Sequence, residues 1–277
     1  MNSLKNNMSG RKLYISDLHL GHVNVTRAGR DFDKRGFKDL NEMHEAITMK
    51  WNNAVTNADH VYILGDVMWK ASSKNYYYYK SLLNGLNGNK HLILGNHDNF
   101  STNRYRKLFE EIIPYKEVDD RLNGENKRVI LSHYYMPFYN HHYRGAVMLH
   151  GHSHNSAESD MERRLTAMLN RQGFPCQIYN VGCMYPYIDY APRTLQYIVD
   201  HYDNSADYGR NAREDDGFED VIQALLDYHK SHPDKGFIQT LNGLLGDGIS
   251  SMTDKTAVQK ICSHIGNHSE VKKTCIR

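Results

Sequence analysis

The sequence predicts a fold of the α/β or α+β class over residues 11–199, followed by a tail of different character. Short apolar runs, typical of strands, alternate with longer segments whose apolar residues recur at helical spacing. A chain of 277 residues that is 40% hydrophobic and 24% charged can bury a large core. We therefore divide it into a domain of residues 1–200 and a helical C-terminal extension, residues 201–277.

Each predicted strand is a short apolar run that ends at a polar turn. Such runs fit strands buried in a sheet, because they are too short for helices and are closed by Gly, Ser or Asp. In chain order they cover residues 13–15, 61–64, 92–94, 129–131, 146–149, 178–181 and 195–199.

The predicted helices are marked by apolar stripes and by residues that begin or end a helix. Asp39 and Glu42 form a plausible capping pair at the start of a helix that runs to residue 55. Ser72 or Ser73 opens a second helix, and Gly88 lies past its end. Further helices are expected over residues 103–112, 156–170, 218–226 and 237–245.

Charge and composition limit the classes of partner. The formal charge is only +2, which does not indicate a nucleic-acid or membrane surface. Residues 1–200 carry five more basic than acidic side chains, which suits a small anionic substrate. No apolar run approaches the roughly 18 residues of a membrane span, and the four cysteines lack C-x-x-C spacing. We expect a cytoplasmic protein with reduced thiols and no membrane contact; the sequence leaves its oligomeric state open.

Five of the predicted strands end in residues that can bind a divalent metal. Because these side chains follow strand ends, a sheet would gather them along one edge. In Asp-x-His and His-x-His, side chains that alternate along an extended chain would point the same way. The residues are Asp17, His19, Asp66, Asn96, His97, His133, His152 and His154.

The donor types favour a pair of metal ions. Mixed Asp, His and Asn donors without cysteine suit Mn, Fe, Zn, Ni or Mg, and we expect manganese first. Seven of these eight residues are good ligands, which are too many for one tetrahedral ion and suit two ions that share a carboxylate. Any single motif can be structural in a chain with 17 histidines, so the prediction depends on the whole ordered set.

The candidate residues form five sequence blocks, one after each of the five strands. These blocks resemble the signature of the calcineurin-like metallophosphoesterase superfamily, and the resemblance covers residues 11–199. It implies a four-layer αββα sandwich of two mixed sheets flanked by helices. One metal would be held by Asp17, His19 and His154. The other would be held by Asn96, His133 and His152, with Asp66 bridging both. His97 would be the catalytic histidine and bind no metal. From its adjacency to His97, and not from the resemblance, we expect Asp98 to orient that histidine.

Within that superfamily, the chain more closely resembles small bacterial or phage-type phosphoesterases. Ser16 to His22 reads Ser-Asp-x-His-x-Gly-His, and Asn180-Val181-Gly182 follows the last block. The protein serine/threonine phosphatases of the superfamily carry the motif Gly-Asp-x-x-Asp-Arg-Gly, which this chain lacks. The resemblance implies a dinuclear metal-dependent phosphoesterase that hydrolyses a phosphodiester, with nucleotide-derived esters among the candidates. A metal-bridging hydroxide would attack phosphorus, assisted by His97.

Three alternatives remain open at this point. The same site could serve a nuclease, which would call for a larger basic groove, or a phosphomonoesterase. The fold could also be a catalytically silent metal-binding scaffold for protein partners, although such descendants usually lose His97 or a ligand. The aromatic residues after His133 (Tyr134, Tyr135, Phe138) either stack on a base of the substrate or pack against the rest of the domain. His22 either contacts the substrate or is an ordinary loop residue.

Overall fold

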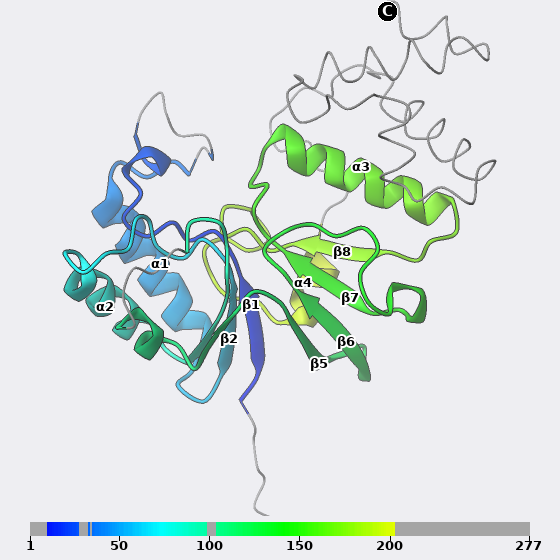
Figure 1. Cartoon of the computed structure of the whole chain (residues 1–277), viewed down its shortest axis with the longest axis horizontal. Coiled ribbons are helices and arrows are strands. Elements are labelled where there is room, and N and C mark those ends of the chain that lie inside the picture. Colours follow the sequence, from blue (N-terminus) through cyan, green and yellow to red (C-terminus); the bar gives the residue numbers. More distant parts are fainter. Residues whose placement is uncertain (1–9, 28–32, 34, 99–103, 203–277) are drawn as a thin grey trace, which may run out of the picture. The chain divides into compact units, whose positions relative to one another are not determined.

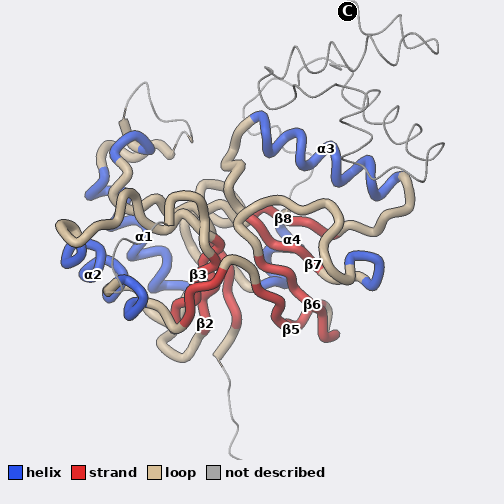
Figure 2. Tube along the Cα trace, viewed as in Figure 1, coloured by secondary structure: helices blue, strands red, loops and turns tan. Residues whose placement is uncertain are grey.

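The computed structural model describes residues 10–27, 33, 35–98 and 104–202 of the chain. These residues form two four-stranded sheets and four α-helices (Figures 1 and 2). The first sheet has the order β1 (Lys12–Ile15), β2 (His60–Leu64), β3 (Asn89–Ile93), β4 (Glu111–Ile113). The second has the order β5 (Lys116–Leu122), β6 (Glu125–Leu131), β7 (Val147–His150), β8 (Gln177–Asn180). The helices are α1 (Leu40–Ala54), α2 (Tyr76–Asn84), α3 (Ala157–Arg171) and α4 (Leu195–His201).

The fold class expected from the sequence is confirmed, with one correction to the sheets. The second sheet is mixed, because β5 and β6 are antiparallel whereas β6, β7 and β8 are parallel. The first sheet was expected to be mixed, but its four described strands are all parallel. Helices α1 and α2 lie in the β1–β2 and β2–β3 connections, and such crossovers return the chain to the same end of the sheet.

Helix α1 shows how the local sequence sets an element. The Asp39 side chain accepts a hydrogen bond from the backbone N–H of Glu42, and the Glu42 carboxylate accepts one from the N–H of Lys38. This reciprocal pairing satisfies backbone donors that have no partner inside the helix. The apolar stripe of Met43, Ile47 and Trp51 is buried. The helix therefore begins at the predicted residue and turns its predicted face to the core.

The edge strand β1 is joined to the chain segment that follows β8. The N–H of Ser16 donates to the carbonyl of Val181 at 2.9 Å, and the N–H of Cys183 donates to the carbonyl of Ser16 at 3.0 Å. These backbone bonds bring the carboxyl ends of the parallel strands of both sheets to one region. The predicted site residues follow these strand ends.

Several local predictions were wrong. Residues 195–199 form the start of α4 instead of a strand, because the Thr194 hydroxyl accepts a hydrogen bond from the N–H of Tyr197 and caps a helix.

Residues 103–112 were expected to be one helix. The structure has a 3-10 turn at Tyr105–Leu108 and then β4, whose isoleucines pair with β3. The second helix begins at Tyr76, later than expected, because Asn75 closes a turn back to Ser72.

Strand β5 was not predicted, because its sequence is mostly polar. It pairs with β6 through a hairpin whose turn residues, Asn123 and Gly124, both have positive φ (52° and 80°). Asn-Gly is a strong hairpin signal, so the sequence did carry the information. The helices expected over residues 218–226 and 237–245 lie outside the described residues.

Two further sequence expectations touch the described part of the chain. Among its helices, none has the length and apolar content to cross a membrane. Cys176 and Cys183 are both buried and free. Cys262 and Cys275 lie outside the described residues.

Asp59 ties the turn after α1 to the start of β1. Its carboxylate accepts hydrogen bonds from the backbone N–H of Arg11 at 2.9 Å and of Thr56 at 2.8 Å. The Arg11 guanidinium donates to the same carboxylate at 2.7 Å. The Asp59 side chain is only 4% exposed. The hydrogen bond from Arg11 holds the pKa of Asp59 well below its usual range.

We expect Asp59→Asn to lower the free energy of unfolding by about 1–3 kcal/mol at neutral pH, since the buried side chain loses the charge with which it binds Arg11 and two backbone N–H groups. The folded-state pKa is depressed, so the carboxylate stabilises the fold above its unfolded-state pKa of about 3.9. That contribution is lost as the pH falls toward the folded-state value. Urea unfolding followed by circular dichroism should show the gap between wild type and variant shrinking from about pH 7 to about pH 3. A gap of equal size at both would contradict this.

Candidate metal centre

The predicted site residues all lie just past the carboxyl ends of parallel strands. Asp17 and His19 follow β1, and Asp66 follows β2. Asn96 and His97 follow β3, His133 follows β6, and His152 and His154 follow β7. The structure gathers all of these residues except His97 into two adjacent clusters.

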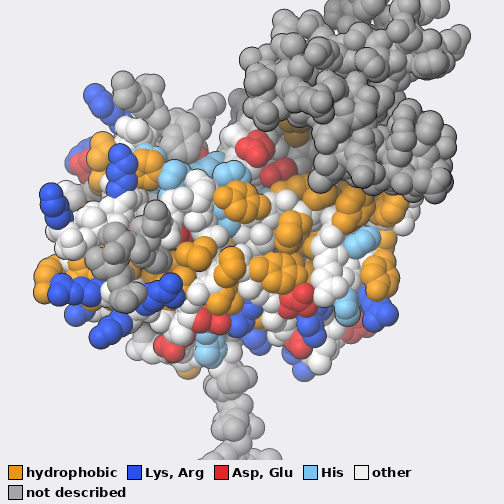
Figure 3. Space-filling model, viewed as in Figure 1, with side chains coloured by type: hydrophobic (Ala, Val, Ile, Leu, Met, Phe, Trp, Pro, Cys, Tyr) orange, Lys and Arg blue, Asp and Glu red, His pale blue; other side chains and the backbone are white. Residues whose placement is uncertain are grey.

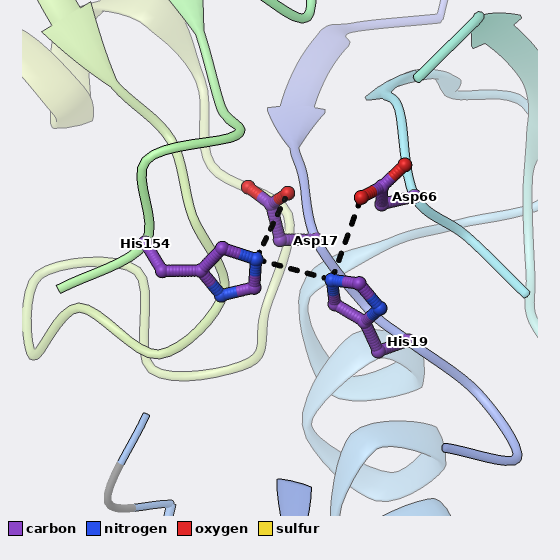
Figure 4. A group of neighbouring side chains, drawn as sticks. All are labelled: Asp17, His19, Asp66 and His154. Atoms are coloured by element: carbon purple, nitrogen blue, oxygen red, sulfur yellow. Dashed lines mark hydrogen bonds and ion pairs between the residues drawn. The ribbon is translucent and has the colours of Figure 1, made fainter. Parts of the chain in front are cut away.

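The first cluster consists of Asp17, His19, Asp66 and His154, whose ligand atoms all lie within 4.8 Å of one another (Figure 4). The Nε2 atoms of His19 and His154 are 3.1 Å apart. His154 Nε2 lies 3.7 Å from Asp17 Oδ1, and His19 Nε2 lies 3.6 Å from Asp66 Oδ2. Both rings and both carboxylates therefore point at one small volume.

The second cluster is centred on the side-chain oxygen of Asn96. Asn96 Oδ1 lies 2.9 Å from His133 Nε2 and 3.0 Å from His152 Nδ1. His133 Nε2 is also 3.7 Å from Asp66 Oδ1. The two oxygens of Asp66 thus face different clusters, Oδ2 toward the first and Oδ1 toward the second.

The hydrogen bonds of His133 suit a cation at the second cluster. His133 Nδ1 lies 2.8 Å from the carbonyl of Leu64, so Nδ1 carries a proton, and in the neutral ring Nε2 has an electron pair. That electron pair faces the oxygen of Asn96, which is also an acceptor. In the neutral ring these two acceptors repel each other, and a cation bound to both would remove the repulsion. The donor set, which lacks thiolates, suits a divalent ion of the Mn, Fe, Zn, Ni or Mg type.

Burial and charge act differently on the three candidate ligand histidines whose pKa values are displaced. Burial lowers the pKa of His19 well below its usual value and also lowers that of His152. Burial acts the same way on His154, but the carboxylates of Asp17 and Asp33 outweigh it and its pKa is raised. Burial raises the pKa of Asp66. A bound cation would reverse the last effect, because it favours the carboxylate.

The backbone at the strand ends is left-handed, which corrects one sequence expectation. In Asp-x-His and His-x-His, the two side chains were expected to point the same way because the chain was taken to be extended. The φ angles are instead positive, so the chain turns at each of these residues. Asp17 and His19 reach the same cluster, whereas His152 and His154 reach different clusters. Asp and His tolerate this region better than branched residues. The values are 58° for Asp17, 48° for His19, 52° for Asp66, 73° for His152 and 51° for His154.

Glycines allow the ligand segments to approach one another. A Cβ atom on Gly95 would lie 2.3 Å from Asp66 Oδ1, and one on Gly65 would lie 2.2 Å from His133 Nδ1. A Cβ on Gly151 would lie 2.5 Å from Asp17 Oδ2. Each glycine therefore leaves room for a side chain of another block.

His97 lies at the opening of the site. Its side chain is 38% exposed, and its Nε2 is 3.8 Å from Asp66 Oδ2. Its backbone N–H donates to Asp66 Oδ1 at 2.9 Å. The ring stands beside the first cluster, with its centre 5.6 Å from that of His19.

Asp98 was expected to orient His97, but the structure places its carboxylate elsewhere. It accepts hydrogen bonds from the backbone N–H groups of Asp66 at 2.8 Å, Val67 at 3.0 Å and Gly95 at 2.9 Å. Burial raises its pKa to about 6. Asp98 thus fastens the turn after β3 to the turn after β2.

A sequence model of the calcineurin-like phosphoesterases matches residues 10–229, which is most of the chain. The chain belongs to the calcineurin-like phosphoesterase family. The cluster of Asp17, His19, Asp66 and His154 agrees with this membership, because its residues could hold a metal ion. The match continues to residue 229, past the domain boundary that we expected at residue 200. That boundary stays a prediction.

Curated relatives share parts of the family domain. The chain is 40% identical to the uncharacterized protein MJ1445 of Methanocaldococcus jannaschii over 95 residues, which are 34% of the chain and 50% of that relative. It is 29% identical to the Gene 66 protein of Mycobacterium phage L5 over 167 residues, 51% of the chain and 76% of the phage protein. The chain thus spans half the length of the first of these relatives.

A solved structure is also similar. It is the crystal structure of a protein of unknown function, AQ665, from Aquifex aeolicus. The identity is 22% and the TM-score 0.46, with 67% of this chain and 95% of that chain covered.

Sequence reasoning missed three residues beside the two clusters. Trp69 stacks on His22 with ring centres 3.7 Å apart and lies 4.6 Å from the ring of His97. Its position three residues after Asp66 was the only available signal. Asp33 and Arg35 are buried behind the first cluster, and no motif marks them.

We expect Gly95→Ala to weaken metal binding, because the new methyl group would displace Asp66. Overpacking of this kind costs about 1–3 kcal/mol, or roughly a 5- to 150-fold loss of affinity. The measurement is Mn²⁺ affinity of the chelator-treated chain by calorimetry.

The matched control for this variant is Gly85→Ala. Gly85 ends α2 with an ordinary φ of −75°, and a Cβ there would meet helix carbonyls at 3.3 Å or more. It should bind Mn²⁺ as the wild type does. Equal affinity in Gly95→Ala and Gly85→Ala would show that close packing on Asp66 is unimportant.

Proposed function

We propose that the chain is a phosphodiesterase that uses two divalent ions, manganese first, to hydrolyse a small nucleotide-derived diester. The observation that carries this proposal is the position of Asp66, whose two oxygens face two separate groups of electron-pair donors. One ion would be held by Asp17, His19 and His154. The other would be held by Asn96, His133 and His152, and Asp66 would be shared.

The ions and the protein divide the work. Bound divalent ions would supply positive charge for the phosphate and lower the pKa of a bound water. The chain's own contribution is to fix the donor atoms and to provide a proton. His97 is suited to the second task, because it stands outside both groups of donors and its ring reaches solvent. We assign it the protonation of the leaving oxygen.

Asp98 takes a positioning role in this proposal. By binding three backbone N–H groups it holds the segment of Asn96 and His97 against the segment of Asp66. A general acid and the donors beside it have to be fixed within fractions of an ångström for efficient catalysis. Asp98 would act through these backbone bonds and not through the imidazole of His97.

Aromatic rings on both sides of the site favour a diester over a monoester. Trp69 lies beside His97, and Tyr134 lies 4.8 Å from the ring of His152 and is 48% exposed. Figure 3 shows histidine side chains at the surface with hydrophobic side chains beside them. A diester has an organic group on each side of phosphorus, and a base on one of them can stack on such rings.

A screen with chromogenic esters tests the proposal. We expect bis-p-nitrophenyl phosphate to be hydrolysed faster than p-nitrophenyl phosphate in the presence of Mn²⁺, and chelator to stop both reactions. The nucleoside diester p-nitrophenyl thymidine phosphate should show a lower KM than methyl p-nitrophenyl phosphate. A faster monoester would favour a monoesterase, and no turnover of any ester would favour a binding scaffold.

His97→Ala should lower kcat for the preferred diester by about 10²–10⁴, the usual contribution of a general acid. Both metal ions should remain bound, because His97 is not among their proposed donors. Asp66→Asn is the matched comparison and should lose metal and activity together. Metal content measured beside turnover separates the two cases; an unchanged rate in His97→Ala would refute the role assigned to it.

A further inference from the structure

A buried ion pair, Asp33 with Arg35, lies directly behind the first cluster. Arg35 donates to Asp33 Oδ2 from Nη2 at 2.8 Å and from Nε at 2.9 Å. Both side chains are fully buried. Burying two charges is costly, and replacing such a pair with apolar residues is often neutral or stabilising. Packing alone is therefore a weak reason for this pair to be here.

The second oxygen of Asp33 contacts a predicted metal ligand. Asp33 Oδ1 lies 2.7 Å from Nδ1 of His154. An ionised carboxylate only accepts hydrogen bonds, so Nδ1 carries a proton, and in the neutral ring Nε2 keeps its electron pair. Nε2 is the atom that faces Asp17 and His19 in the first cluster. Asp33 thus selects the form of His154 that can bind a cation.

Arg35 connects the same pair to the other side of the cluster. Its Nη2 also donates to the carbonyl of Asp17 at 2.8 Å, and its Nη1 donates to the carbonyl of Leu18 at 3.0 Å. Asp17 is one of the residues with a left-handed backbone. Arg35 therefore supports the turn that presents Asp17, while it also fixes the carboxylate that orients His154.

We infer that Asp33, held by Arg35, is a positioning residue for the metal ion of Asp17, His19 and His154. The inference rests on the metal site proposed above. A carboxylate behind a ligating imidazole fixes its tautomer and raises its basicity, and loss of such a partner typically weakens metal binding 10- to 100-fold. The second group, Asn96 with His133 and His152, has its own partner in the carbonyl of Leu64 and should not depend on Asp33.

The test uses the full chain after chelator treatment, with Mn²⁺ titrated by calorimetry. Asp33→Leu alone would leave Arg35 charged and unpaired in the interior, so the main variant is Asp33→Leu with Arg35→Met. We expect one of the two Mn²⁺ sites to weaken 10- to 100-fold and the other to keep its affinity. Asp33→Asn should give a smaller loss, because its amide oxygen can still accept from His154 but carries no charge.

A second measurement is independent of metal. Nitrogen-15 NMR of the imidazoles in the metal-free chain should show His154 protonated at Nδ1 in the wild type. That form should lose population in the double variant. Asp59→Asn is the matched control, since it also disrupts a buried aspartate paired with an arginine, and it should leave both the His154 tautomer and Mn²⁺ affinity unchanged.

The outcomes separate this inference from the proposed function. A wild-type chain that takes up no Mn²⁺ would overturn both. If the wild type binds two ions and the folded double variant binds both equally well with an unchanged tautomer, only the role of Asp33 is overturned. Equal weakening of both sites would also overturn it, because that result indicates general loosening. Should the double variant unfold on circular dichroism, the comparison of Asp33→Asn with wild type decides by the same criteria.

Discussion

The crowding of electron-pair donors around the carboxylate of Asp66 is the constraint that the surrounding structure satisfies. Histidine nitrogens lie 3.6 to 3.8 Å from its oxygens, and the amide oxygen of Asn96 lies 2.9 Å from His133 Nε2, whose ring already binds the carbonyl of Leu64 through Nδ1. With the imidazoles neutral, this crowding of acceptors is unfavourable without a cation. The protein holds it in place through bonds to the backbone, and this rigidity distinguishes a binding site from a chance cluster of polar residues.

The backbone conformation at the ligands is part of this rigid arrangement. Left-handed residues other than glycine are uncommon and cost of order 1–3 kcal/mol each when strained. Here they occur at five of the seven predicted ligands. Asp98 and Arg35 bind the peptide groups beside these turns, so buried charged side chains offset the cost of the unusual conformations. The ligand turns are thus stabilised by residues that are not themselves expected to bind a metal.

The sequence predicted what depends on short-range pattern. Apolar runs identified the strands that carry the site, and the order of Asp, Asn and His after them identified the candidate ligands. It missed β5, whose polar residues hide a strand that only the Asn123–Gly124 turn reveals, and it mistook α4 for a strand because the Thr194 cap was overlooked. Asp33 and Trp69 escaped notice for another reason: the site residues that they contact are distant in sequence, and only tertiary contact reveals them.

The origin of the two donor groups has a consequence for how the domain holds together. In each group, residues that follow strands of the first sheet face residues that follow strands of the second: Asp17 with His154, and Asn96 with His133 and His152. An ion bound to either group would be a bond between the sheets. Its binding free energy would then count toward folding by mass action, which makes metal supply and resistance to unfolding one linked quantity.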